Sequence, residues 1–340
     1  MITPETSIFE IDGIDLQYGG SLTNARLAYA TWGELNSDRD NAVLFPTYYT
    51  GTHKDNATMI GKGRALDPDR YFIIVPNMFG NGVSSSPSNM LAPCAAADFP
   101  GISILDNVIC QQRLLDEVFG ITSIKLVMGW SMGAMQAYQW GAAYPDQVQN
   151  MLCVCGSARV SPHNRVFLDG VESALRADQQ FNDGRYTDKP VQGLKAFARV
   201  YAGWAYSQAF YRDALYKDLG FETIEELLLS WEQDHLAWDA NDLLAMLWTW
   251  KHADIGKTPG MDNNFNKALA SITARSVIMP CNTDLYFTVA DNAGEIAHMP
   301  NAELRVIHSD WGHIAGGPGR VASVSDFIDK TIDELLLNKS

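Results

Sequence analysis

The sequence predicts an α/β fold built on a mostly parallel, doubly wound sheet. Short apolar runs recur along the chain, and each is followed by a glycine-rich or polar turn. Helical patterns separate several of these runs, for example residues 107–119 before the third run and 132–144 after it. Such runs are typical of strands buried on both faces of a parallel sheet, and their alternation with helices indicates this fold class. The six runs are 42–48 (AVLFPTY), 71–77 (YFIIVPN), 123–129 (SIKLVMG), 150–156 (NMLCVCG), 276–282 (SVIMPCN) and 302–308 (AELRVIH).

Two segments depart from this alternation. Residues 7–35 alternate apolar and polar side chains around turn signals, which predicts an antiparallel hairpin or meander. Residues 157–270 are helical and aromatic in pattern. We therefore expect a core from residues 1–156 and 271–340, with 157–270 inserted as a helical lid over the carboxyl edge of the sheet, where such sheets bind ligands. The alternative is a helical flank that only packs against the core.

The composition excludes several classes of protein. The 340 residues include 25 Lys and Arg against 40 Asp and Glu, and the net charge of −15 with no basic cluster argues against nucleic-acid binding. We find no apolar run long enough to span a membrane. The N-terminal MITPETSIFEIDG lacks the regions of a secretory signal, so we expect a cytoplasmic protein. The five irregularly spaced cysteines are expected to be buried free thiols.

The pentapeptide Gly-Trp-Ser-Met-Gly at 129–133 has the pattern G-x-S-x-G. The apolar run IKLVM precedes it and the helix-like MGAMQAYQWGAAYP follows, so Ser131 is expected on a strand-to-helix turn. Such a turn lifts the hydroxyl above the sheet, and the two glycines let the chain bend sharply. The helix N-terminus also offers amides to a developing oxyanion. Ser131 is therefore the candidate nucleophile, and the alternative is a glycine-bounded turn with an idle serine.

His313 and Asp284 are the candidate general base and orienting acid. His313 follows the last predicted strand, and Asp284 follows the run 276–282 directly. The order Ser–Asp–His is the one found with a nucleophile on this kind of turn. Asp284 would hold the imidazole tautomer and stabilise the imidazolium. The other acids are weaker candidates, because Asp291 lies in a predicted helix and Asp310 is too near His313 in sequence. The other histidines are also weaker candidates for the base. They lie in the last predicted strand (His308), in the lid (His163, His235 and His252), in a helix-like stretch (His298) and after the first parallel strand (His53).

Two backbone amides are candidates for the oxyanion hole. Met132 follows the nucleophile, and its N–H would be the first donor. The second is expected from the loop after the first buried strand, PTYYTGTH, where we favour the N–H of Tyr49. Tyr48 and Tyr49 also suit the walls of the pocket.

The chain as a whole resembles the homoserine O-acetyltransferase family of α/β hydrolases. The matching segments are TWGELN, NAVLFPTYYTGTH, GKGRALDPDRYFIIVPNMFGNGVSSSPS, the stretch from Asp106 through QQRLLDEVFGI into GWSMGAMQAYQWGAAYPDQV, TDLYF, and the GH that ends at His313. Their order and spacing agree along nearly the whole length, and the lid agrees least. The resemblance implies an α/β-hydrolase fold and an acyl-enzyme on the serine, with the acetyl group taken from acetyl-CoA.

The resemblance also implies substrate-binding residues. A lid arginine and a tyrosine seven residues later face the substrate carboxylate in that family, and here they are Arg199 and Tyr206. The position after the histidine usually holds an aspartate for the substrate ammonium group, but here it is Ile314. An unpaired ammonium in a dry pocket is unfavourable, which argues against homoserine. Trp130 also replaces the usual glycine before the nucleophile, and the lid is rich in tryptophan.

These observations favour a carboxylic-ester hydrolase acting on small, mostly apolar esters, acetates among them. The alternative is an acyl-CoA-dependent O-acyltransferase acting on a hydroxyl acceptor, with Arg199 binding a carboxylate. A third possibility is a relative that binds a ligand without catalysis, although all three triad residues are present. No metal-binding motif or dinucleotide fingerprint is found, so we expect no metal and no cofactor beyond acetyl-CoA as a possible co-substrate. The resemblance implies a homodimer joined through the lid helices.

Overall fold

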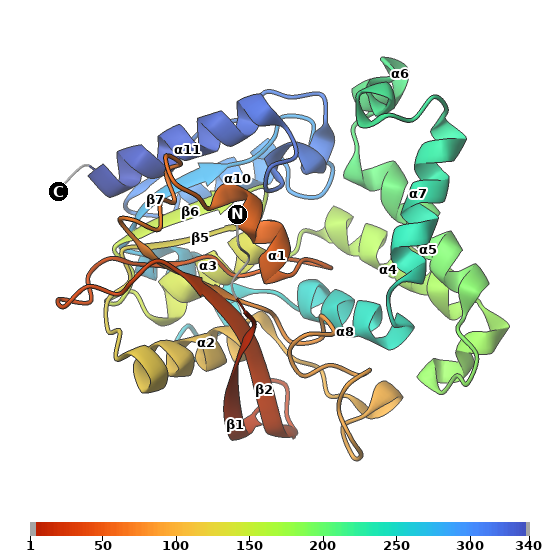
Figure 1. Cartoon of the computed structure of the whole chain (residues 1–340), viewed down its shortest axis with the longest axis horizontal. Helices are drawn as coiled ribbons and strands as arrows, with labels where there is room; N and C mark the ends of the chain where they lie inside the picture. The colour runs from red at the N-terminus through yellow and green to blue at the C-terminus, as the bar shows by residue number, and fades with distance from the viewer. Residues whose placement is uncertain (1–4, 338–340) are drawn as a thin grey trace.

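The computed structural model describes residues 5–337, and Figure 1 shows a central sheet flanked by helices. The sheet has eight strands in the order β1-β2-β4-β3-β5-β6-β7-β8. β2 pairs antiparallel with β1 and with β4, and all other neighbouring strands are parallel. The predicted N-terminal hairpin and the mostly parallel sheet are thus confirmed. The strands are β1 Ser7–Asp15, β2 Ser21–Trp32, β3 Ala42–Leu44, β4 Phe72–Pro76, β5 Leu126–Trp130, β6 Asn150–Val154, β7 Arg275–Met279 and β8 Ala302–Leu304.

Each of the six apolar runs overlaps one of the strands β3 to β8. Every residue of β3, β4 and β5 is buried, as expected for strands covered on both faces. The last strand, at the edge of the sheet, is shorter than its run, although an isolated parallel bridge between Cys281 and Ile307 continues the pairing with the segment after β7. His308, which we expected inside this strand in a core or hydrogen-bonded role, instead lies beyond it and is exposed.

The chain changes its direction across the sheet at β3. β4 follows β3 on one side, and β5 then pairs with β3 on the other side. The loops that leave the carboxyl ends of β3 and β5 therefore start beside each other and diverge. Open α/β sheets bind ligands at such a switch point.

Helices cover both faces of the sheet. Figure 1 shows α11 on one side and α2 with α3 on the other. α2 begins with a capping box between Ser103 and Asp106 and ends at Gly120, whose φ of 61° is the left-handed conformation that glycine favours. The helices outside the insertion are α1 His53–Asn56, α2 Ile104–Phe119, α3 Met132–Ala143, α10 Val289–Ile296 and α11 Ala322–Leu337.

The chain between β6 and β7, residues 155–274, is called the helical insertion below. Figure 1 shows α4 to α8 gathered on one side of the sheet, coloured green to cyan. α5 packs against both α4 and α7. Its α-helices are α4 Pro162–Arg176, α5 Val191–Ala205, α6 Gln208–Arg212, α7 Ile224–Leu236, α8 Ala240–Lys251 and α9 Phe265–Ser271.

All five cysteines are buried and none forms a disulfide, as the sequence predicts. They are Cys94, Cys110, Cys153, Cys155 and Cys281. Within residues 5–337, no helix has the length and apolarity needed to cross a membrane.

Glu295 of α10 is a buried carboxyl group that connects this helix to the start of the insertion. Its Oε1 accepts a hydrogen bond from the amide of Ala158 at 2.9 Å, and its Oε2 accepts one from Nδ2 of Asn292 at 2.9 Å. The same Nδ2 donates to the carbonyl of Gly156. Burial raises the pKa of Glu295 to about 7, because desolvation of the charged form outweighs these hydrogen bonds.

This raised pKa predicts that the folded protein loses stability as the pH rises from about 4.5 to above 7, since the unfolded carboxyl group releases its proton first. Between these limits the wild type should lose up to about 3 kcal/mol of unfolding free energy relative to Glu295→Gln, which has no proton to release. Urea unfolding of both proteins at about pH 5 and pH 8 measures the difference. Equal losses in the two proteins would contradict the prediction.

Candidate active site

Ser131 lies on a sharp turn between β5 and α3, with φ 56° and ψ −125°. Backbone in this region is strained for a non-glycine residue, at a cost of about 1–3 kcal/mol. The neighbouring glycines permit it. A Cβ on Gly129 would lie 2.1 Å from the backbone carbon of Gly133, and one on Gly133 would lie 2.7 Å from the carbonyl oxygen of Pro46. The predicted strand-to-helix turn is therefore present, and both glycines of the pentapeptide are required by contact.

Ser131, His313 and Asp284 form a continuous chain of hydrogen bonds. The Ser131 Oγ lies 3.0 Å from Nε2 of His313, and Nδ1 of His313 lies 2.7 Å from Oδ2 of Asp284. All three residues are at most 5% exposed. The second oxygen of Asp284 accepts hydrogen bonds from the amides of Tyr286 and Phe287, at 2.7 Å and 3.3 Å. The carboxylate thus accepts hydrogen bonds from three donors in a buried site, which fixes its position beside the imidazole.

Aromatic rings enclose the imidazole of His313. Trp130 stacks on it with ring centroids 4.8 Å apart, and its Nε1 donates to the backbone carbonyl of His313 at 3.3 Å. Tyr286 approaches edge-on at 4.8 Å, and Phe287 lies at 5.6 Å. Trp130, which we predicted as a substrate-binding residue, therefore contacts the base directly. The enclosure excludes water, which strengthens every electrostatic interaction within the site.

Cys155 lies against the triad, and we predicted only that it is buried. Its Sγ, a ring nitrogen of His313 and a carboxylate oxygen of Asp284 lie within 4.8 Å of one another. Burial, with Asp284 nearby, raises the pKa of the thiol well above its usual range, so the thiol stays protonated. These ligand types suit Zn²⁺, but here Nδ1 of His313 and Oδ2 of Asp284 are hydrogen-bonded to each other, in the arrangement that orients an imidazole toward a nucleophile. Cys155 lies just past the carboxyl end of β6, and β6 lies between β5 and β7 in the sheet, which brings the thiol beside residues distant in sequence.

The two candidate oxyanion donors are carried by neighbouring segments. Met132 is the first residue of α3, and Tyr49 lies in the loop after β3. The ring of Tyr49 stacks on Tyr201 of the insertion at 5.6 Å, and its hydroxyl donates to the carbonyl of Leu243 in α8. Tyr48 packs edge-on against Trp130 at 4.5 Å. Tyr48 and Tyr49 are both buried, and the loop contacts both the core and the insertion.

Arg199 is not brought to the triad by any contact in the described chain. Its guanidinium donates to Glu225 and to Glu232 of α7, with N–O distances of 2.5 Å in each pair. These carboxylates raise its pKa further above the usual range. Tyr206, seven residues later, is buried, stacks on Phe210 at 4.0 Å and meets Trp231 edge-on at 5.9 Å.

Ile314 and the other candidate residues have clear positions. Ile314 is half-buried and follows His313 in a short 3₁₀ helix. Asp291 lies in α10 and is hydrogen-bonded to Thr288, as the helical pattern predicts. His53 is buried, and its ring contacts Asn77. His235 and His252 each bond the backbone carbonyl of the residue four positions earlier in their own helix.

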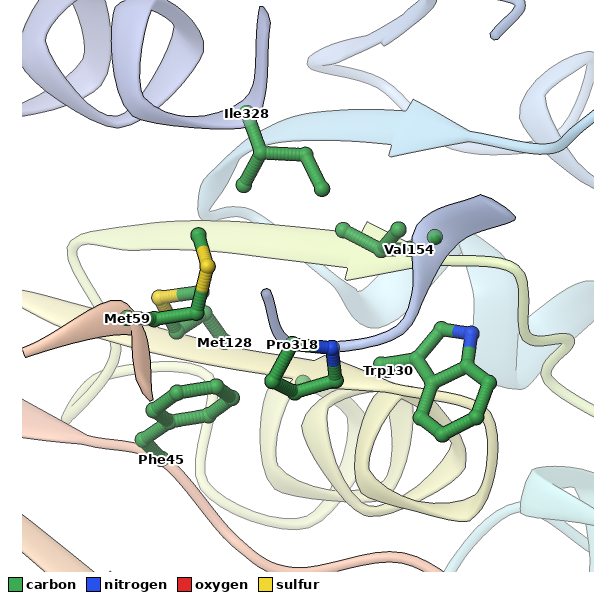
Figure 2. Close-up of a pocket in the computed structure, with 9 residues that line it drawn as sticks. Phe45, Met59, Met128, Trp130, Val154, Pro318 and Ile328 are labelled. Atoms are coloured by element: carbon green, nitrogen blue, oxygen red, sulfur yellow. The ribbon is translucent and has the colours of Figure 1, made fainter. Parts of the chain in front are cut away.

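A small apolar cavity of about 10 Å³ lies behind the nucleophile turn. Figure 2 shows Phe45, Met59, Met128, Trp130, Val154, Pro318 and Ile328 around it. Its volume is enough for about one water molecule, and its walls offer little to bind one. The cavity is therefore a packing defect between the sheet and α11 and does not hold a substrate.

Comparisons with known proteins agree on the family to which the chain is similar. Residues 50–316 match the family described as the alpha/beta hydrolase fold. An ethyl acetate hydrolase of Pseudomonas veronii is 38% identical over 333 residues, covering 97% of this chain and 95% of that protein. A homoserine O-acetyltransferase of Thermobifida fusca is 32% identical over 331 residues, covering 88% of this chain and 86% of that protein.

Solved structures agree with this assignment. The crystal structure of an acetylester hydrolase from Corynebacterium glutamicum matches with a TM-score of 0.95 at 35% sequence identity, covering 98% of this chain and 96% of that one. The match extends over the hairpin, the parallel sheet and the helical insertion alike. The chain therefore belongs to the α/β-hydrolase family, in the branch related to the homoserine O-acetyltransferases.

Proposed function

We propose that this enzyme hydrolyses small acetyl-type esters, with Ser131 as nucleophile, His313 as general base and acid, and Asp284 as the orienting acid. The observation that carries the proposal is the buried, hydrogen-bonded chain that joins these three residues. Similar proteins support the substrate class, since two of them are named for the hydrolysis of ethyl acetate and of acetyl esters.

The reaction proceeds in two steps. Ser131 Oγ attacks the ester carbonyl carbon while its proton passes to Nε2 of His313, and the ester C–O bond then breaks as this proton moves to the departing alcohol. Water then attacks the acyl-enzyme, with His313 again accepting and returning a proton, and the carboxylic acid leaves. Asp284 stabilises the imidazolium formed in each step. The N–H groups of Met132 and Tyr49 are the proposed donors to the oxyanion.

Aromatic side chains support a small and largely apolar substrate. Tyr48, Tyr49 and Trp130 are proposed to form the pocket on the side of the core, and Tyr206 on the side of the insertion. All four are buried, so they would present mainly aromatic surface to a bound ester. Such a site binds an alkyl ester without leaving charged groups unpaired.

The surroundings of Arg199 and Ile314 favour water over an amino-acid acceptor. The Arg199 guanidinium is already paired with two carboxylates, so we propose that it ties α5 to α7 and does not bind a substrate carboxylate. Ile314 offers no charge to an ammonium group. Acyl transfer from acetyl-CoA to a hydroxyl acceptor is the second candidate, supported by the similarity to the Thermobifida fusca acetyltransferase.

We further propose that the protein works in the cytoplasm as a homodimer that associates through the helical insertion. Five buried cysteines without a disulfide suit a reducing compartment. Exposed apolar side chains lie on three neighbouring helices, with Val166 on α4, Val200 on α5 and Leu229 on α7. An apolar surface of this kind supports association.

Ser131→Ala should lower kcat/KM for p-nitrophenyl acetate by at least about 10⁴-fold, because it removes the nucleophile. The melting temperature should not fall, because the substitution removes only the hydroxyl group, and its bond to His313 is not one on which the fold depends. The matched control is Ser276→Ala, which removes a buried hydroxyl on β7 that donates a hydrogen bond to the carbonyl of Ala274. A Ser131→Ala protein with near-full activity would overturn the assignment.

Hydrolysis and acyl transfer are separated by a direct comparison of acceptors. The purified enzyme should release acetate from ethyl acetate with water alone, and acetyl-CoA should release no additional CoA when homoserine is added. Acetate formation and free thiol are measured in parallel. CoA release that depends on a hydroxyl acceptor would instead establish the transferase.

Arg199→Met should change kcat/KM for ethyl acetate by less than about twofold, because the two ion pairs it removes join α5 to α7 and include no residue of the triad. The matched control is Lys195→Met, one helical turn earlier, whose Nζ pairs with the same Glu232. A tenfold or greater loss in Arg199→Met alone would return Arg199 to the substrate site.

A further inference from the structure

Gln136 connects the two segments that carry the proposed oxyanion donors. It lies on α3 one helical turn after Met132, and its side chain is fully buried. Its Nε2 donates to the carbonyl of Thr47 at 2.8 Å and to the carbonyl of Met132 at 3.3 Å. One amide group therefore bonds both the start of the nucleophile helix and the loop after β3.

Each of these carbonyls belongs to the peptide next to one that carries a proposed donor. The Thr47 carbonyl is one peptide before the N–H of Tyr49, and the Met132 carbonyl is one peptide after the N–H of Met132. A planar peptide unit shares one Cα with the next unit, so anchoring its carbonyl restricts the adjacent N–H to the positions that φ and ψ of the shared residue allow. The two bonds thus constrain the direction of both N–H groups relative to each other.

Further buried hydrogen bonds orient the Gln136 amide itself. Nε2 of Gln111 donates to Oε1 of Gln136 at 2.6 Å, and Nε1 of Trp140 donates to Oε1 of Gln111 at 2.8 Å. Because the indole N–H can only donate, the Gln111 oxygen must face Trp140 and its NH₂ must face Gln136. The NH₂ group of Gln136 is then directed to the two carbonyls.

The approach of the two segments makes this bridge possible. Gly133 leaves so little room that a Cβ would lie 2.7 Å from the carbonyl oxygen of Pro46 and 3.4 Å from that of Thr47. On its other side, the same loop is tied to the core by Asn56, which donates to the carbonyl of Phe45, and by Asn81, which donates to that of Gly51. Gln136 is the side chain that reaches this loop from α3.

We infer that Gln136 is a positioning residue, which sets the spacing and direction of the Met132 and Tyr49 amides so that both reach the oxyanion of the transition state. The inference rests on the proposed function. Preorganised donors of this kind act on the transition state more than on the bound ester. Loss of the bridge therefore lowers kcat more than it changes KM.

The test compares Gln136→Met with Gln139→Met in the full-length enzyme. Gln139 lies on the same helix, is also buried, and donates to the hydroxyl of Thr258, away from the loop. Gln136→Met should lower kcat for p-nitrophenyl acetate by about 10-fold to 100-fold with KM within about threefold, since the loss of a whole oxyanion donor costs about 10²–10³. Gln139→Met should change kcat by less than about twofold.

A second readout separates positioning from a general structural effect. A trifluoromethyl ketone forms a tetrahedral adduct whose oxyanion requires both donors, so its inhibition constant should rise with Gln136→Met in proportion to the loss in kcat. Gln111→Met removes the bond that orients the Gln136 amide, together with the acceptor of the Trp140 indole N–H, and leaves both bonds from Gln136 to the two carbonyls in place. It should show the same pattern to a smaller degree, and it covers the case in which Gln136→Met does not fold. Unchanged kcat in either folded variant, or a loss in kcat without weaker inhibition, would overturn the inference. Retained activity in Ser131→Ala would overturn the proposed function instead.

Discussion

The site depends on one backbone constraint, the positive φ of Ser131 at the end of β5. A strained nucleophile is tolerated only where its surroundings fix it, and here they do so from three directions. Gly129 and Gly133 close the turn on itself, and Gly156 lets the end of β6 pass so near that a Cβ would lie 2.4 Å from Ala134. The strand order supplies the third, because β5 lies between β3 and β6, so that the loops leaving these neighbouring strands start on either side of the serine turn.

Burial of an ionic triad is favourable only if its polar groups are satisfied. Asp284 accepts hydrogen bonds from two backbone amides in addition to His313, so its charge is balanced within a site that excludes water. The same reasoning extends to the second layer. Gln111, Gln136 and Trp140 are fully buried, yet their side-chain donors all have acceptors. The polar groups around the site are therefore hydrogen-bonded although aromatic side chains bury them.

The sequence predicts the fold and the identity of the triad better than it predicts the supports around them. Strands buried on both faces leave continuous apolar runs, and the serine turn leaves a short local pattern, so both are visible without a structure. Gln136 and Cys155 leave no such pattern, because their partners are distant in sequence: Gln136 meets Thr47, and Cys155 meets Asp284. The resemblance assigns Arg199 to substrate binding, and only the packing of α5 on α7 shows the two carboxylates with which its guanidinium is paired.

Hydrolysis and acyl transfer share their first half, so the distinction between them must come from groups that act after the acyl-enzyme has formed. An amino-acid acceptor must be bound through fixed charges if it is to react with the acyl-enzyme before water does. Water needs only a general base, and His313 has already served as that base for Ser131 in the first step. In this chain the position after His313 is Ile314, and the Arg199 guanidinium is neutralised by Glu225 and Glu232. The triad is unchanged by either feature. The catalytic triad therefore does not distinguish hydrolysis from acyl transfer, and the difference must lie in the groups that would hold an acceptor.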